Sequence, residues 1–169
     1  MHDPRRPAPW IPDRRQPDQA VLYDDLAREL DALLAGEPDR IANAANAAAA
    51  LYHALPELNW AGFYFLQGDE LVLGPFQGRP ACVRIGLGKG VCGTAAAQRR
   101  SVVVPDVEAF PGHIACDTAS RSELVVPLLQ GDVLLGVLDL DSPRTGRFDE
   151  TDRAGCEVLA QVIVRHLGR

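Results

Sequence analysis

Apolar residues recur at helical spacing in two stretches near the beginning of the chain. The first follows Asp18 and ends where Gly36 provides a stop signal; its apolar positions are Leu22, Leu26, Leu30, Leu33 and Leu34. The second follows Pro38 and Asp39 and continues through the alanine-rich segment 41–52. This periodicity, with capping residues before and glycine after, predicts two amphipathic helices. We expect them to form a helical hairpin or an interface element.

Two pairs of apolar segments are joined by short polar turns. They are 60–66 and 70–76 around Gln67-Gly68-Asp69, and 124–129 and 133–140 around Gln130-Gly131-Asp132. Strand-like segments with glycine and aspartate between them predict β-hairpins.

The remaining elements are shorter or come at the end of the chain. Segments 82–85 and 101–104 have the composition of short strands, and 90–100 is predicted to be a helix that begins with glycines. Asp149 can cap a final helix that carries Leu159, Ile163 and Leu167. Two helices, about six antiparallel strands interrupted by a helix and a long loop, and a last helix indicate the α+β class.

Composition limits the extent of this domain, its binding partners and its location in the cell. Residues 1–17 are rich in proline and arginine and predict a flexible arm, which leaves residues 18–169 as one domain. A net charge of −6 argues against a nucleic-acid surface. No apolar run approaches the roughly 20 residues of a membrane span, and no apolar segment follows the basic N-terminus as in a secretory signal. We therefore expect a cytoplasmic protein.

In a reducing compartment, four cysteines are more often free, metal-bound or catalytic than a disulfide framework. Cys116 lies in the polar loop 110–123, Cys82 begins a predicted strand, and Cys92 lies in the first turn of a predicted helix, where the helix dipole favours a thiolate. Cys156 has the apolar surroundings of an inert core cysteine.

Two other interpretations of the loop cysteines remain open. They can be unreactive thiols, or they can form a zinc site with His113. The gaps of 10 and 24 residues between the three cysteines contain no Cys-x-x-Cys pair, which argues against zinc.

Three carboxylates are predicted to meet at one end of the second hairpin. Asp139 and Asp141 lie on the same face of a strand, and antiparallel pairing brings Glu123 beside them. Like charges this close favour retention of a proton near neutral pH. The alternative is a solvated strand end.

Two further features have weaker signals. The glycine-rich run 86–94 departs from a phosphate-binding loop, because Lys89 precedes Gly90 instead of serine or threonine. Alternation places Trp60 and Tyr64 on one strand face, where they can form an aromatic wall or ordinary core.

Several segments together resemble the free methionine-R-sulfoxide reductases, which are stand-alone GAF-domain enzymes. The similarity runs from about Tyr23 to the C-terminus. The matching segments are Asn59-Trp60-Ala61-Gly62-Phe63-Tyr64, Gln77-Gly78-Arg79-Pro80-Ala81-Cys82, Gly88-Lys89-Gly90-Val91-Cys92-Gly93, Phe110-Pro111-Gly112-His113-Ile114-Ala115-Cys116-Asp117 and Gly136-Val137-Leu138-Asp139-Leu140-Asp141-Ser142-Pro143.

The resemblance implies reduction of free methionine-(R)-sulfoxide without a bound cofactor. It implies that Cys116 is the nucleophile that becomes a sulfenic acid, with Cys82 as the resolving cysteine and Cys92 as a second one. The resulting disulfide would be reduced by thioredoxin.

The resemblance also implies roles for the pocket residues. Glu123, Asp139 and Asp141 would polarise and protonate the sulfoxide, Trp60 and Tyr64 would contact its methyl end, and backbone amides around Ile114 and Ala115 would hold the substrate carboxylate. A homodimer is also expected. The alternative function is a GAF ligand-binding or redox-sensing module without turnover.

Overall fold

The computed structural model describes residues 18–168, and the segment 1–17, predicted as a flexible arm, lies outside them. The described elements are α1 (Gln19–Leu34), α2 (Arg40–Ala54), β1 (Trp60–Gln67), β2 (Glu70–Gly78), β3 (Arg84–Gly86), α3 (Gly90–Gln98), β4 (Val102–Val104), the 3₁₀ helix η1 (Val107–Ala109), β5 (Ser122–Gln130), β6 (Val133–Ser142) and α4 (Glu150–His166). No helix within 18–168 is both long and apolar enough to cross a membrane.

The strands form one antiparallel sheet in the order β3-β2-β1-β6-β5-β4. Both predicted hairpins are present, and each turns through a Gly-Asp pair. Gly68 and Gly131, the first turn residues, have φ values of 66° and 59°, a backbone conformation that glycine adopts without steric cost. The predicted α+β class with about six antiparallel strands is confirmed.

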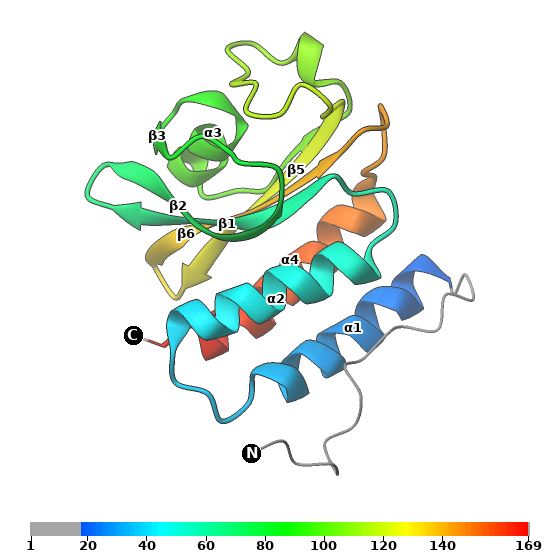
Figure 1. Cartoon of the computed structure of the whole chain (residues 1–169), viewed down its shortest axis with the longest axis vertical. Helices are drawn as coiled ribbons and strands as arrows, with labels where there is room; N and C mark the ends of the chain where they lie inside the picture. Colours follow the sequence, from blue (N-terminus) through cyan, green and yellow to red (C-terminus); the bar gives the residue numbers. More distant parts are fainter. Residues whose placement is uncertain (1–17, 169) are drawn as a thin grey trace.

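The sheet separates two apolar layers (Figure 1). Helices α1, α2 and α4 cover one face, and α3 lies on the other face with the loop that precedes β5. Strand alternation divides β1 between these layers: Phe63 packs with the three long helices, whereas Trp60 and Tyr64 pack with α3.

Aspartate side chains begin the three long helices. Asp18, Asp39 and Asp149 each accept a hydrogen bond from a backbone amide in the first turn of α1, α2 and α4. At α4 the amide of Asp149 also donates to Asp152, which completes a capping box. The predicted cap at Asp149 is therefore confirmed.

Some element boundaries differ from the sequence predictions. β3 begins at Arg84, so Cys82 precedes the strand that it was predicted to begin. The chain at Cys82 is instead joined to the loop before β5 by a disulfide to Cys116. Helix α3 ends at Gln98, because Arg99 adopts the left-handed conformation and its amide bonds to Ala95 and Ala96.

A buried polar cluster attaches α1 and the β6–α4 connection to α4. Asp152, which is 0% exposed, accepts hydrogen bonds from the Tyr23 hydroxyl at 2.7 Å and from Arg147 Nη1 at 3.0 Å. Arg147 is itself buried and also donates to the carbonyl of Pro56. The charge of Asp152 thus compensates the buried guanidinium.

We predict that Asp152→Ala destabilises the fold strongly, because it leaves Arg147 buried without its anion. The expected loss in the free energy of unfolding is about 3–5 kcal/mol, measured by urea denaturation. Asp24→Ala is the control, because it removes the same type of side chain at an exposed position. It should change the free energy of unfolding by less than about 0.5 kcal/mol. Equal effects of the two substitutions would contradict the compensating role of Asp152.

Candidate active site

Three carboxylic acids meet on the α3 side of the sheet, at the end of the β5–β6 pair. Glu123 lies opposite Asp141 in the antiparallel register, and Val125 lies opposite Asp139. Glu123, Asp139 and Asp141 line one pocket. The hairpin argument from the sequence therefore placed these three groups correctly.

Burial and mutual repulsion keep protons on these acids. Burial is the larger cause for Glu123, whose pKa rises to about 8, and the neighbouring charge of Asp141 adds to it. The pKa values of Asp139 and Asp141 are also well above the ordinary range, first through burial and then through repulsion from Glu123 and Asp139 respectively. The prediction that the cluster retains protons near neutrality agrees with these directions.

Cys92 lies against this acidic cluster from α3. It is 4% exposed, and its Sγ donates to Glu123 Oε1 at 3.9 Å. Burial, then the charges of Asp139 and Glu123, raise its pKa well above that of a free thiol. The expected thiolate at the helix N-terminus is therefore wrong, because desolvation and nearby carboxylates outweigh the helix dipole.

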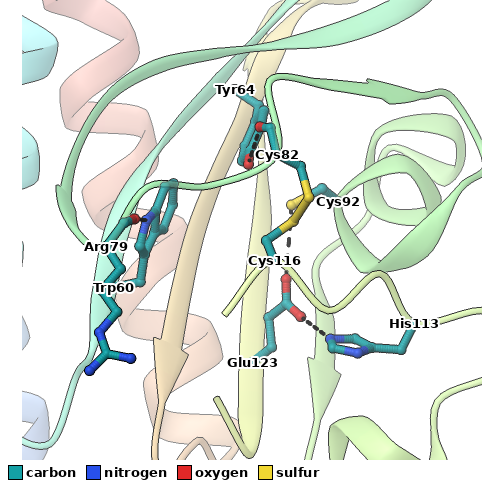
Figure 2. Close-up of a disulfide and its surroundings, with 8 residues drawn as sticks. All are labelled: Trp60, Tyr64, Arg79, Cys82, Cys92, His113, Cys116 and Glu123. Atoms are coloured by element: carbon teal, nitrogen blue, oxygen red, sulfur yellow. Dashed lines mark hydrogen bonds and ion pairs between the residues drawn. A yellow bond between two sulfur atoms is a disulfide. The ribbon is translucent and has the colours of Figure 1, made fainter. Parts of the chain in front are cut away.

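Cys82 and Cys116 form a disulfide beside the acids (Figure 2), with their Cα atoms 5.5 Å apart. The Tyr64 hydroxyl donates to the carbonyl of Cys82 at 2.9 Å, so β1 supports the segment that carries this cysteine. The zinc set considered from the sequence, three cysteines and His113, is not assembled here because two of its sulfurs are bonded to each other.

His113 connects the cysteine loop to the acids, a link that the sequence did not reveal. Its Nε2 lies 3.5 Å from Glu123 Oε2. Burial lowers the pKa of His113 below its usual value, whereas that of Glu123 is raised. Both shifts favour the neutral forms of the two groups in this contact.

Aromatic rings close one side of the pocket. The rings of Trp60 and Tyr64 stack with their centroids 6.0 Å apart, and Trp60 also stacks on Phe76 at 5.2 Å. The indole Nε1 donates to the carbonyl of Arg79 at 3.1 Å, which fixes the ring (Figure 2). Trp60 and Tyr64 both line the pocket, as an aromatic wall requires.

The structure brings most of the predicted site residues together. Those that line the pocket are Trp60, Tyr64, Cys92, Ile114, Cys116, Glu123, Asp139 and Asp141. Cys82 belongs to the site through its bond to Cys116. Ala115 is exposed and is not among the lining residues, so its predicted backbone contact to a substrate remains a prediction.

A polar contact that the sequence did not predict positions the cysteine loop. The Asn59 amide donates to Asp117 Oδ2 at 3.1 Å and to Ser120 Oγ at 3.0 Å. Asp117 and Ser120 line the pocket next to Cys116. Asn59 immediately precedes β1. Its position directly before Trp60 is the only feature of the sequence that pointed to a role near the pocket.

The glycine-rich run and the fourth cysteine have structural explanations. A Cβ at Gly93 would lie 2.3 Å from the carbonyl oxygen of Gly86, so the turn into α3 requires glycine there. Cys156 is fully buried, and burial raises its pKa to about 12. Its position in the helical core agrees with the predicted inert role.

Comparisons with known proteins match this architecture. Residues 42–167 match the family model of the GAF domain. The free methionine-R-sulfoxide reductase of Escherichia coli is 53% identical over 89% of this chain and 91% of its own length. The chain belongs to the free methionine-R-sulfoxide reductase family. The expected GAF fold is thereby confirmed.

Solved structures of the family agree with this assignment. The free methionine-R-sulfoxide reductase of Neisseria meningitidis, solved with its substrate, has a TM-score of 0.86 and 46% identity, and the match covers 89% of this chain and 91% of that one. A Burkholderia vietnamiensis structure provisionally described as a GAF sensor protein has 62% identity and the same TM-score, over 89% of this chain and 96% of that one.

The raised pKa of Glu123 predicts a pH-dependent stability. An ordinary glutamate titrates near 4.5 and the folded protein holds this proton to about pH 8, so between these values the folded state binds more protons than the unfolded state. The free energy of unfolding should therefore fall as pH rises from 5 to 8, by at most about 1.4 kcal/mol per pH unit from this group.

Glu123→Gln should flatten this dependence. Urea denaturation of the oxidised protein at several pH values provides the measurement, and Glu108→Gln, at an exposed glutamate, is the matched control. An identical pH slope in the wild-type protein and Glu123→Gln would show that Glu123 is ionised throughout.

Proposed function

We propose that this protein reduces free L-methionine-(R)-S-oxide to L-methionine through Cys116. The observation that carries the proposal is the position of Cys116, which is bonded to Cys82 and lies in the same pocket as three carboxyl groups with raised pKa values. A sulfoxide requires a nucleophile for its sulfur and proton donors for its oxygen, and this pocket holds both kinds of group.

In the first step, the reduced Cys116 attacks the sulfoxide sulfur. Protons supplied by the buried acids assist transfer of the oxygen, so methionine leaves as the thioether and Cys116 becomes a sulfenic acid. Cys82 then attacks the sulfenic sulfur and the oxygen leaves as water. In total, two thiols and one sulfoxide give one disulfide, one methionine and one water.

The disulfide favours Cys82 as the resolving cysteine. Cys82 and Cys116 have the Cα separation of 5.5 Å that a disulfide needs. Cys92 is buried with a raised pKa, which lowers its thiolate fraction and therefore its rate of attack. We assign Cys92 a secondary role in resolution.

The pocket is suited to a small zwitterion. Trp60 and Tyr64 would contact the substrate methyl group, and side-chain oxygens of Asp117 and Asp141 would accept hydrogen bonds from its ammonium group. The amides of Ile114 and Ala115 would bind its carboxylate, since neither has a backbone partner within residues 18–168. Recognition of both charged groups would exclude a methionine sulfoxide residue within a protein, which lacks them.

We further propose that thioredoxin reduces the disulfide and that the protein acts as a homodimer without a bound cofactor. A dithiol reductant follows from the chemistry, because turnover regenerates a disulfide that must be opened by thiol exchange. The competing proposal is a GAF sensor without turnover, which the description of the Burkholderia relative favours. A turnover assay separates the two functions.

In the presence of thioredoxin, thioredoxin reductase and NADPH, free methionine-(R)-sulfoxide should cause NADPH consumption. Cys116→Ser should lose this activity and even single-turnover methionine release, because it removes the nucleophile. Cys156→Ser, which changes a buried cysteine outside the pocket, is the control and should retain turnover. A folded wild-type protein that consumes no NADPH would support the sensor function instead.

Cys82→Ser should separate release from recycling. The reduced variant should release one methionine per chain and then turn over poorly with thioredoxin, because the sulfenic acid lacks its principal partner. Thiol counts before and after substrate, with mapping of the joined cysteines, provide the check. If Cys82→Ser retains steady-state turnover and Cys92→Ser does not, the two cysteines have exchanged roles.

A further inference from the structure

Three potential metal ligands, all buried, converge in the pocket from three different elements. Cys92 comes from α3, Glu123 from β5 and Asp139 from β6. The Cys92 sulfur and one carboxylate oxygen of each acid all lie within 4.8 Å of one another, and all three residues are buried. Figure 2 shows Cys92 and Glu123 facing each other beside the disulfide. The arrangement is therefore preformed.

An unsatisfied oxygen indicates that this cluster accepts a ligand. Asp139 is 6% exposed, and its Oδ1 has no hydrogen-bond partner among residues 18–168 although it is buried. Buried polar atoms in folded proteins are nearly always paired with protein or water. Since Asp139 lines the pocket, a bound group there can satisfy this oxygen.

The acidic groups around the cluster can bind a cation in place of the protons that they hold. Four carboxyl groups line the pocket, those of Asp117, Glu123, Asp139 and Asp141, whereas its basic residues are Lys89, which is exposed, and His113. Within residues 18–168, no guanidinium or ammonium group is buried among these acids, in contrast to the Arg147–Asp152 pair on the helical side.

The donor set identifies the class of cation. Magnesium and calcium prefer six or more oxygen ligands, whereas a thiolate with two carboxylates suits zinc. Ligands of a tetrahedral zinc ion lie roughly 3.5 Å apart, and Cys92 Sγ is 3.9 Å from Glu123 Oε1. His113 Nε2, 3.5 Å from the other Glu123 oxygen, can orient this carboxylate, as groups behind metal ligands often do.

We infer that Cys92, Glu123 and Asp139 bind one Zn²⁺ ion, with the fourth coordination position open to the pocket. The set differs from the zinc site considered in the sequence, because it uses two acids and only one cysteine. An ion here would occupy the acids that protonate the sulfoxide, so zinc would inhibit reduction. The inhibition rests on the proposed function, whereas the binding does not.

Cobalt titration of the oxidised protein tests the binding. With Cys82 and Cys116 joined, they cannot capture the ion, and Cys92 and Cys156 are the remaining thiols. Co²⁺ replaces zinc in most sites and absorbs in the near ultraviolet when a thiolate coordinates it. We expect one Co²⁺ per chain with this band, and its displacement by one equivalent of Zn²⁺.

Variants identify the ligands. Cys92→Ser should lose the near-ultraviolet band, Asp139→Asn should weaken Co²⁺ binding at least tenfold, and Cys156→Ser should bind like the wild-type protein. Absence of the band in the wild-type protein, or its persistence in Cys92→Ser, would overturn the inference. Circular dichroism of each variant checks that it is folded.

Inhibition is measured separately on the reduced protein. Single-turnover release of methionine should fall as Zn²⁺ is added and recover when a chelator removes it. Normal release at zinc concentrations that fill the site would overturn the inhibitory role. A protein that binds Co²⁺ but never releases methionine would contradict the proposed function and support the metal site. Normal methionine release without Co²⁺ binding would support the proposed function and overturn the metal site.

Discussion

The site depends on the burial of three carboxyl groups against one another, with no buried cation among them in the described part of the chain. Carboxylates in this position cannot all ionise, so protons remain on them near neutral pH and the pKa of the adjacent Cys92 thiol rises as well. In the proposed function the same cluster would supply protons to the sulfoxide oxygen, and in the further inference it would bind a divalent cation. Both consequences follow from one arrangement of β5 and β6.

The register of the central strands maintains that arrangement. Asp139 and Asp141 face the pocket because alternate residues of β6, Leu138 and Leu140, face the helical core. A slip of one residue would exchange these two sets. Gly136 makes the pairing possible, since a Cβ there would lie 2.0 Å from the carbonyl oxygen of Tyr64 on β1. Stability of the fold and chemistry of the site are therefore set by the same register.

Local signals in the sequence predicted the parts of this protein that depend on neighbouring residues. The Gly-Asp turns and strand alternation located both hairpins, and with them the meeting of Glu123 with Asp141. Contacts between distant segments left no such signal, as for His113 with Glu123 or Asn59 with Asp117. The charge state of Cys92 was mispredicted for a related reason: the helix dipole is visible in the sequence, whereas desolvation and the approach of two strands are not.

Cys92 and Cys156 show why burial by itself does not define the role of a cysteine. Both are free thiols with almost no exposed surface and raised pKa values. Cys156 donates to the hydroxyl of Tyr23, which in turn donates to Asp152, whose charge Arg147 compensates. The polar groups of this chain of contacts thus all have partners. Around Cys92, by contrast, the acids have no such counterion within 18–168, and one oxygen of Asp139 has no partner there. Both thiols are buried, and they differ in whether the acidic groups near them have a cation as partner. This difference is the reason that we propose a chemical role for Cys92 and a packing role for Cys156.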